Sequence, residues 1–338
     1  MRMLIPDIAG GMEQIETVHY DSARANALLP LHTLYYPLGF PVEIFTNSPA
    51  VLAAAQDSWG LFSPRFAGSP LTLRIEVTSD PAVSPTVPPA TICKMHGNLM
   101  GIVADAYNFA ISDLNAGCSV SWVTRQTAES TLYFRYHLLE AAALSMVAAL
   151  RAAPLHAACV APYGHGMLLC GDSGAGKSSL AFAGARAGWT FISDDASYLP
   201  FERDDRMVIG NCHKIRLRDS GVQLFPELEG RPVTPRAAGK PSIEIPTADM
   251  PELCKSDSAT VESIIFLNRR GVETPGLVPF PREAALSWFN QFLYPTTACH
   301  RIQESVVHRL LHVEIFELRY TDLDWAIERL ETLALTGR

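Results

Sequence analysis

The chain has 338 residues, of which 48% are hydrophobic and 18% charged, a balance typical of a folded protein with a sizeable core. Its net charge of −8 comes from 27 basic and 35 acidic residues that are scattered along the sequence, which argues against nucleic acid as a partner. The seven cysteines form no C-x-x-C pair, so a zinc or redox site of that type is not expected.

Nothing in the sequence resembles a membrane segment. No run of 18 apolar residues occurs, and the apolar stretch at the N-terminus is too short for the core of a signal peptide. We therefore expect a cytoplasmic protein that does not bind membranes.

Residues 1–132 are expected to form a small α+β domain. Within it, 40–46 and 71–78 alternate between apolar and polar residues, as half-buried strands do. The proline-rich stretch 79–91 is expected to be a loop or the edge of a sheet. No motif in this domain points to a ligand.

The second domain is expected to cover 133–338 and to begin with a bridging helix over 133–151. This stretch has high helix propensity and apolar residues at helical spacing, and Pro154 follows its end. Met146 and Tyr136 are expected to be core residues of this helix rather than ligand contacts.

From 155 onward the pattern becomes that of an α/β nucleotide-binding core. Strand, loop, helix and strand follow one another over 155–162, 166–170, 176–187 and 189–193. Further strands are expected at 213–218, 242–246, 261–269 and 312–320. A last helix is expected over 322–335, with Thr321 or Asp322 as its N-cap.

Residues 171–178, GDSGAGKS, satisfy the pattern G-x-x-x-x-G-K-[ST] between an expected strand and an expected helix. In such loops the backbone N–H groups and the helix N-terminus bind phosphate oxygens. We expect ATP to be bound by Gly171, Asp172, Ser173, Gly174, Ala175, Gly176, Lys177, Ser178 and Ser179. Lys177 would reach the β and γ phosphates, and the Ser178 hydroxyl would ligate Mg²⁺. The alternative, a glycine-rich turn without a ligand, is disfavoured because the motif and both flanking elements agree.

Two carboxylates, Asp194 and Asp195, follow the expected strand 189–193. Ligands of open sheets lie beyond the carboxyl ends of strands, so these residues are expected beside the loop, one on Mg²⁺ and the other as a proton acceptor. A turn or capping role is the alternative. His156 precedes Gly171 on an expected antiparallel strand, and the residues alone leave it unassigned. Cys212 beside His213 could suggest a metal, but a structural role is favoured.

The segments HAACVAPYGHGMLLCGDSGAGKSS and GWTFISDD together resemble the catalytic domain of HPr kinase/phosphorylase and its relatives. The resemblance covers about residues 154–200 and implies a fold related to phosphoenolpyruvate carboxykinase. It also implies a serine kinase in which Asp195 is the general base, Lys177 and Ser178 bind phosphate and Mg²⁺, and His156 assists. With Asp195 as the base, Asp194 is the aspartate expected to hold Mg²⁺.

The sequence departs from that family at Ser179, where the bifunctional enzymes carry an acidic residue, and in the loop 219–246. Neither phosphorylase activity nor HPr as substrate is therefore expected. The chain looks closer to related kinases associated with lasso peptides, which phosphorylate a serine of a precursor. In or near the loop, phosphate-clamp candidates are Arg231, Arg236 and Lys240, and candidates for a second Mg²⁺ ligand are Glu227 and Glu244.

Three functions are compatible with these features. The first is an ATP-dependent kinase acting on a hydroxyl of a peptide, protein or small molecule. The second is a regulator that binds ATP without transferring its phosphate, and the third is a carboxykinase-type enzyme, which would need a transition-metal site of Lys, His and Asp. Retention of Asp194 and Asp195 beside the lysine loop favours the kinase. A homo-oligomer is possible for such a protein.

Overall fold

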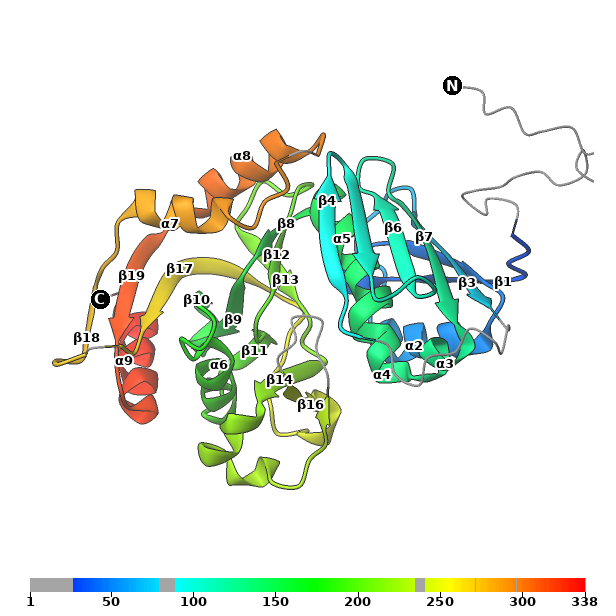
Figure 1. Ribbon diagram of the computed structural model, residues 1–338. Helices are drawn as coiled ribbons and strands as arrows, with labels where there is room; N and C mark the ends of the chain where they lie inside the picture. The colour runs from blue at the N-terminus through cyan, green and yellow to red at the C-terminus, as the bar shows by residue number, and fades with distance from the viewer. Residues whose placement is uncertain (1–26, 79–88, 235–240, 271, 296, 338) are drawn as a thin grey trace, which may run out of the picture.

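The computed structural model describes residues 27–78, 89–234, 241–270, 272–295 and 297–337. Figure 1 shows two α/β units side by side, the first running from blue to green and the second from green to red. Each unit is built on its own large sheet, and a third, three-stranded sheet packs beside the second. The fold is therefore mixed α/β with several sheets.

The first unit is a seven-stranded mixed sheet in the order β1-β2-β3-β7-β6-β5-β4. Its strands are β1 (Leu31–Tyr35), β2 (Val42–Thr46), β3 (Leu71–Thr78), β4 (Ile92–His96), β5 (Leu99–Val103), β6 (Phe109–Asp113) and β7 (Cys118–Thr124). The three strands β2, β3 and β7 are parallel and the other pairs antiparallel, with α2 (Pro49–Trp59) connecting β2 to β3. The strands expected at 40–46 and 71–78 are β2 and β3. Of the stretch 79–91, residues 79–88 lie outside the described chain.

The helix expected over 133–151 is divided. After α3 (Arg125–Glu129) come α4 (Thr131–Phe134), a π-helical segment over Arg135–Leu139, and α5 (Glu140–Leu150). Met146 of α5 is fully buried in one hydrophobic cluster with residues of the first sheet, such as Leu73, as expected of a core residue. These helices thus pack with the N-terminal unit.

The second unit is a nine-stranded sheet. Its strands are β8 (Ala152–Leu155), β9 (Ala157–Ala161), β10 (Gly166–Cys170), β11 (Thr190–Ser193), β12 (Ser197–Pro200), β13 (Met207–Gly210), β17 (Ser258–Asn268), β18 (Gly276–Pro279) and β19 (Glu314–Arg319). The central strand β10 pairs antiparallel with β9 and parallel with β17, which in turn pairs parallel with β19. The strands expected in this region are present within a few residues. The continuous apolar sequences of β9 and β10 match their burial on both faces.

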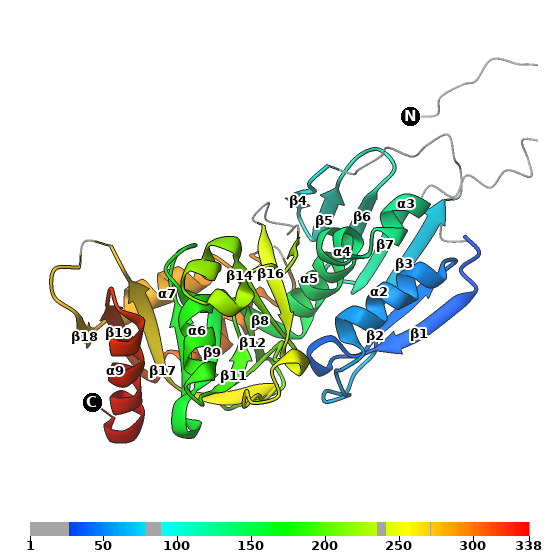
Figure 2. The same cartoon turned by 90° about the horizontal axis from the view of Figure 1, so that it is seen from below.

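Helices cover both faces of this sheet (Figures 1 and 2). On one face lie α6 (Lys177–Arg186), α9 (Leu323–Thr336) and the small sheet of β14 (Lys214–Arg218), β15 (Val233–Thr234) and β16 (Ser242–Pro246). On the other lie α7 (Arg282–Asn290) and α8 (His300–Leu310), which the sequence analysis did not predict. The N-cap of α9 is Asp322, whose side chain accepts the N–H of Trp325 at 2.8 Å.

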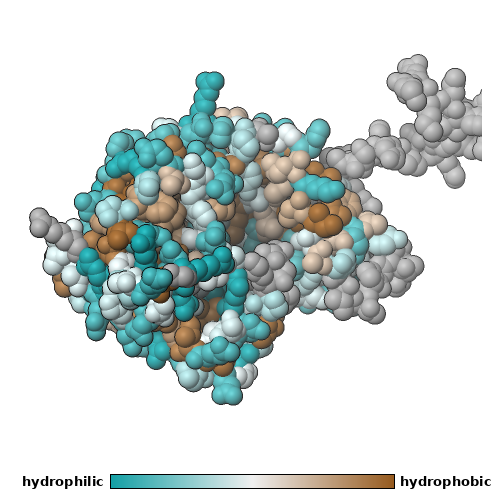
Figure 3. Space-filling view, turned by 60° about the vertical axis from the view of Figure 1, so that its left-hand side comes forward, coloured by the Kyte–Doolittle hydropathy of each residue, from teal (hydrophilic) through white to brown (hydrophobic). Residues whose placement is uncertain are grey.

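The two units share an interface. The hydrophobic cluster of the first sheet includes Tyr198, Met207 and Ile209 of the second unit, and Arg65 pairs with Asp257 across the boundary at 2.7 Å. On the face shown in Figure 3, apolar residues occur in separate patches among hydrophilic ones. No described helix is long and apolar enough to cross a membrane.

Candidate functional site

The glycine loop joins β10 to α6, as the motif predicts. Gly171, Gly174 and Gly176 have φ values of 146°, 94° and 102°, a region in which other residues are strained. A Cβ on Gly176 would also approach the hydroxyl oxygen of Tyr320 to 2.7 Å. The backbone conformation therefore favours glycine at all three positions, and at Gly176 the close packing on Tyr320 adds a second reason.

Lys177, the first residue of α6, turns its side chain back over the loop. Its Nζ donates to the carbonyl oxygen of Gly171 at 2.8 Å and lies 3.1 Å from Nε2 of His156 and 3.9 Å from Oδ1 of Asp195. The side chain is 5% exposed, and burial lowers the pKa of Lys177 while Asp195 opposes this effect. The ammonium group is thus held in place by three oxygen or nitrogen atoms at the mouth of the loop.

His156 occupies the single position between β8 and β9 and faces both charged residues. Its Nδ1 lies 3.7 Å from Oδ1 of Asp195, and its other ring nitrogen, Nε2, is the one next to Lys177. The antiparallel pairing of β9 with β10, in which Ala157 is opposite Cys170, carries His156 to the loop. The structure therefore brings together the three residues proposed as catalytic from the sequence.

The two aspartates after β11 differ in their surroundings. Asp194 is 9% exposed, and its Oδ2 accepts the backbone N–H of Arg216 at 2.7 Å, while its carbonyl oxygen accepts the Ser178 hydroxyl at 3.1 Å. The Asp195 side chain is 33% exposed and lines the same cavity as Ser178. Asp194 instead lines a smaller cavity between the two units. The carboxylate next to the loop cavity is thus that of Asp195.

A cavity of about 540 Å³ opens above the loop. Besides the loop residues, it is lined by three arginines, Arg216, Arg218 and Arg269. Nη2 of Arg218 donates to the Ser173 hydroxyl at 2.6 Å, and the Arg269 guanidinium lies 5.5 Å from the ring centroid of Tyr320. We will call this space the loop cavity.

Sequence reasoning missed Arg218 and Arg269. The signal that could have found them is their position, because Arg218 ends β14 and Arg269 directly follows β17. The residues predicted from the sequence as phosphate clamps or as a second Mg²⁺ ligand are not found in the loop cavity among the described residues. Arg231 pairs with Asp249 at 3.2 Å and Glu227 with Arg186 at 3.0 Å, and neither lines the loop cavity. Arg236 and Lys240 lie outside the described residues.

A second cavity, of about 230 Å³, adjoins the loop. Gly171 of the loop lines it, and Gly174 and Arg269 line both this cavity and the loop cavity. Its walls include aromatic side chains. Phe266 and Phe280 stack with their ring centroids 4.1 Å apart, and Trp288 meets Phe266 edge to face at 6.0 Å. This space offers a flat apolar wall beside the loop, and we will call it the aromatic cavity.

Glu244, the candidate for a second metal ligand, is buried in a charged network between the units. Its carboxylate pairs with Arg216 at 2.8 Å and accepts a hydrogen bond from the hydroxyl of Tyr136. Arg216 also reaches Glu140 of α5 at 3.0 Å. Burial alone would raise the pKa of Glu244, but Arg216, then Lys214 and Arg135, outweigh it and hold the pKa at about 2. Tyr136, expected in the core, is thus also a polar contact between units.

Within the described residues, no three or more His, Cys, Asp or Glu side chains are grouped so as to hold a metal ion. His213, whose position beside Cys212 could suggest a metal, lines a pocket between the units rather than the loop cavity. At the loop, the candidate metal ligands are oxygen atoms of a hydroxyl and a carboxylate. The Ser178 hydroxyl and the Asp195 carboxylate are ligands that suit Mg²⁺, so the donor set fits that ion.

Comparison with known proteins gives little at the level of sequence. No family model matches the chain, and no curated protein matches it. Among solved structures, an Hpr(Ser) kinase/phosphatase from Coxiella burnetii aligns with a TM-score of 0.30 and 14% identity, over 55% of this chain and 95% of that one. The likeness is distant, and the proposals below rest on the geometry of the chain itself.

Proposed function

We propose that the protein is an ATP-dependent kinase that transfers the γ-phosphate of Mg·ATP to a hydroxyl of a peptide, a protein or a small molecule. The observation that supports this most is the meeting of Lys177, His156 and Asp195 at the mouth of the glycine loop, within 3.1 to 3.9 Å of one another. Phosphoryl transfer requires charge neutralisation, positioning and a carboxylate near the attacking oxygen, and these groups supply all three.

In the proposed reaction, the acceptor oxygen forms a bond to the γ-phosphorus as the bond from that phosphorus to the β–γ bridging oxygen breaks. The acceptor proton passes to Asp195, and the bridging oxygen leaves with the electron pair as part of ADP. Lys177, Arg218 and Arg269 neutralise the phosphate oxygens from the walls of the loop cavity. His156, between Lys177 and Asp195, orients both side chains.

Mg²⁺, held by Ser178 and Asp195, would neutralise charge on the β and γ phosphates. Asp194 acts differently in this proposal from the role expected from sequence. By accepting the Ser178 hydroxyl on its carbonyl and the Arg216 N–H on its carboxylate, it positions α6 and β14 on either side of the loop cavity. The nucleoside would lie in the aromatic cavity, with its base against Phe266, Phe280 or Trp288.

The experiment is transfer of labelled γ-phosphate from Mg·ATP to a panel of serine-containing peptides, carrier proteins and free hydroxy compounds. Wild type is compared with Asp195→Asn and with Asp204→Asn, which changes an exposed aspartate outside the cavity. We expect transfer to at least one acceptor, a loss of about 10²-fold or more in Asp195→Asn, and no change in Asp204→Asn. Equal transfer by all three proteins would exclude Asp195 as the base.

A regulator that binds ATP without transfer is the second candidate, and one observation favours it. The Arg216 side chain bridges Glu140 of the first unit and Glu244, while its backbone N–H holds Asp194 next to the loop. Nucleotide occupancy could therefore be reported to the first unit. Tight binding of Mg·ATP without transfer to any acceptor or to water, and a change in the first unit on binding, would favour this function over the kinase.

A further inference from the structure

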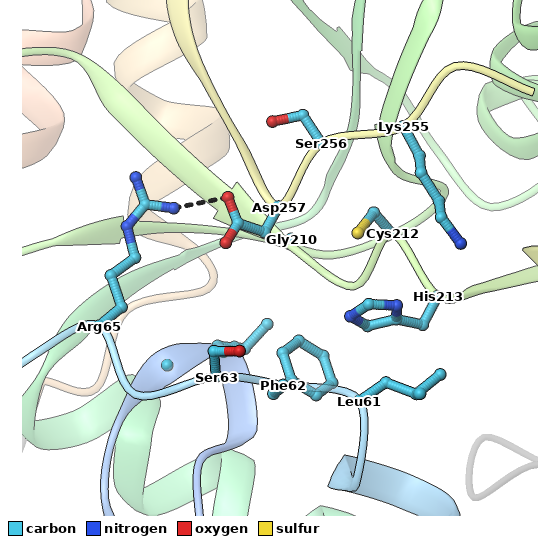
Figure 4. Close-up of a pocket in the computed structure, with 12 residues that line it drawn as sticks. Leu61, Phe62, Ser63, Arg65, Gly210, Cys212, His213, Lys255, Ser256 and Asp257 are labelled. Atoms are coloured by element: carbon cyan, nitrogen blue, oxygen red, sulfur yellow. Dashed lines mark hydrogen bonds and ion pairs between the residues drawn. The ribbon is translucent and has the colours of Figure 1, made fainter.

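A pocket of about 270 Å³ lies between the two units, away from the loop (Figure 4). Among the residues that line it, the first unit contributes Leu38, Phe62 and Arg65, and the second contributes His213, Lys255 and Asp257. None of these residues lines the loop cavity. We will call this space the interdomain pocket, and none of the residues named in the proposed transfer reaction lines it.

The pocket has an excess of positive charge. Arg65 and Asp257 pair across its mouth at 2.7 Å and neutralise each other, as Figure 4 shows. Asp257 is the only acidic residue among the described side chains that line it. Lys255, whose Nζ donates to the hydroxyl of Thr247 at 2.9 Å, therefore contributes a charge that no lining carboxylate balances.

His213 lies close enough to Lys255 for the lysine charge to affect the pKa of its ring. Its ring meets Phe62 edge to face with centroids 4.8 Å apart, and no hydrogen bond joins a ring nitrogen to another described residue. Burial lowers the pKa of His213, and Lys255 lowers it further, while Asp257 acts in the opposite direction. The ring thus offers a neutral N–H donor next to an ammonium group, a combination suited to an oxygen anion.

The remaining wall is apolar. Leu38, Leu61 and Phe62 form it, so that polar donors and an apolar surface face one small volume. Pockets of this kind bind ligands whose body is apolar and whose few polar atoms fix the orientation. The volume accommodates a molecule of roughly ten non-hydrogen atoms, at about 20 to 30 Å³ each.

We propose that the interdomain pocket binds a small organic anion, with its carboxylate or phosphate group on Lys255 and His213 and its apolar body on Phe62 and the leucines. Because Leu38 and Phe62 also line the smaller cavity that reaches Asp195, the anion lies next to the acceptor side of the site. The anion is either one end of the acceptor or a separate effector. Both have the same recognition chemistry.

The test is calorimetric titration of the full chain with butyrate, benzoate and inorganic phosphate, in the presence of saturating Mg·ADP. Wild type is compared with Lys255→Met, with Lys94→Met on the exposed strand β4, and with Lys177→Met at the loop. We expect Lys255→Met to weaken binding of at least one of these anions about 10-fold to 100-fold. Lys94→Met and Lys177→Met should leave that affinity unchanged, and Lys255→Met should leave Mg·ADP binding unchanged.

Lys255 is exposed, so its substitution is not expected to unfold the protein. Phe62→Trp is a second variant that fills the pocket without removing charge, and it too should weaken binding. The proposal is overturned if no anion binds, if affinity is the same in wild type and Lys255→Met, or if binding is lost only in Lys177→Met.

Kinetics then distinguish the two sources of the anion, and both results support the site. An anion that competes with the acceptor in the transfer assay occupies the position of one end of the acceptor. An anion that changes kcat without competing is an effector. If transfer is not observed at all, the titrations still test the pocket, so failure of the proposed kinase function is distinguishable from failure of this inference.

Discussion

The chain contains two groups of basic residues that differ in how their charge is balanced. Between the units, Arg135, Arg216 and Lys214 are paired with Glu140, Glu244 and Asp57 at 2.5 to 3.5 Å. In the loop cavity, Lys177, Arg218 and Arg269 have Asp195 as the only acid among the described lining residues. Balanced charges hold two units together, whereas unbalanced ones are available to a polyanion such as ATP.

The largest effect is expected when the central charge of the loop cavity is removed. Lys177→Met keeps an apolar chain of similar length in a buried position but deletes the ammonium group, so phosphoryl transfer should fall roughly 10³-fold. The measurement is the initial rate of γ-phosphate transfer. Lys94→Met, on exposed strand β4, is the control and should be as active as wild type, and a fully active Lys177→Met would separate the loop from catalysis.

Substitutions in the network between the units should mainly lower the free energy of unfolding. Glu244→Ala removes the carboxylate that Arg216, Lys214 and Arg135 share, so Glu140 and Asp57 are left to balance three cations. A buried charge without a compensating partner costs about 3 to 5 kcal/mol. Urea unfolding measures this loss, with Glu229→Ala at an exposed position as the control. A loss below about 1 kcal/mol would mean that the network does not hold the units together.

The same carboxylate predicts a pH dependence. The pKa of Glu244 is about 2 in the folded protein, below the usual value of about 4.3, so its contribution to stability is complete above pH 5. It is lost as the pH falls from about 4.3 towards 2, where the folded state also takes up the proton. The urea midpoint of wild type should drop across this range more steeply than that of Glu244→Gln.

A smaller effect is expected at the edge of the loop cavity. Arg218 is exposed and donates to the Ser173 hydroxyl, so Arg218→Ala should weaken Mg·ATP binding about tenfold through the loss of one charged hydrogen bond. Arg218→Lys should recover part of the affinity because it restores the charge but not the guanidinium geometry. Unchanged affinity in Arg218→Ala, measured by calorimetry, would place the phosphates away from this wall.

The smallest effect is expected for a charged residue that lies outside both the network between the units and the loop cavity. Glu227 forms an exposed ion pair with Arg186 at 3.0 Å, so Glu227→Gln should change the free energy of unfolding by less than about 0.5 kcal/mol. Transfer and its Mg²⁺ dependence should also be unchanged. A weaker apparent affinity for Mg²⁺ in this variant would restore Glu227 as a metal ligand.

The parts of the site that follow from local sequence could be predicted. The loop, its flanking strand and helix, and the aspartates after β11 lie within about thirty residues, where motif and hydrophobic pattern agree. His156 could be placed near the loop because it directly precedes β9, which pairs with the neighbouring strand β10. The roles of these residues in transfer remain predictions.

The rest depends on contacts between distant segments. Arg218 and Arg269 reach the loop cavity from the ends of β14 and β17, and although a position at a strand end is a signal, only the fold shows which strand ends meet the loop. The parallel pairing of β3 with β7 joins strands about 45 residues apart, so alternation could indicate the strand β3 but not its neighbour. Charged residues such as Glu244 and Arg231 were plausible ligands by type, and only the fold shows that they are already paired.

The π-helical segment Arg135–Leu139 has a consequence for how this chain can vary in length. Such segments contain one residue more than the α-helical turn they replace. Removing that residue would rotate all that follows by about 100° relative to what precedes it, given 3.6 residues per turn. Arg135, the first residue of the segment, meets Glu140 at 3.1 Å, and the two would still face each other four residues apart in an α-helix. Phe134 of α4, which is fully buried in the core of the first unit, would instead be turned away from its contacts. The number of residues between Phe134 and α5 is therefore a sequence feature by which homologues with the same packing of these helices can be recognised.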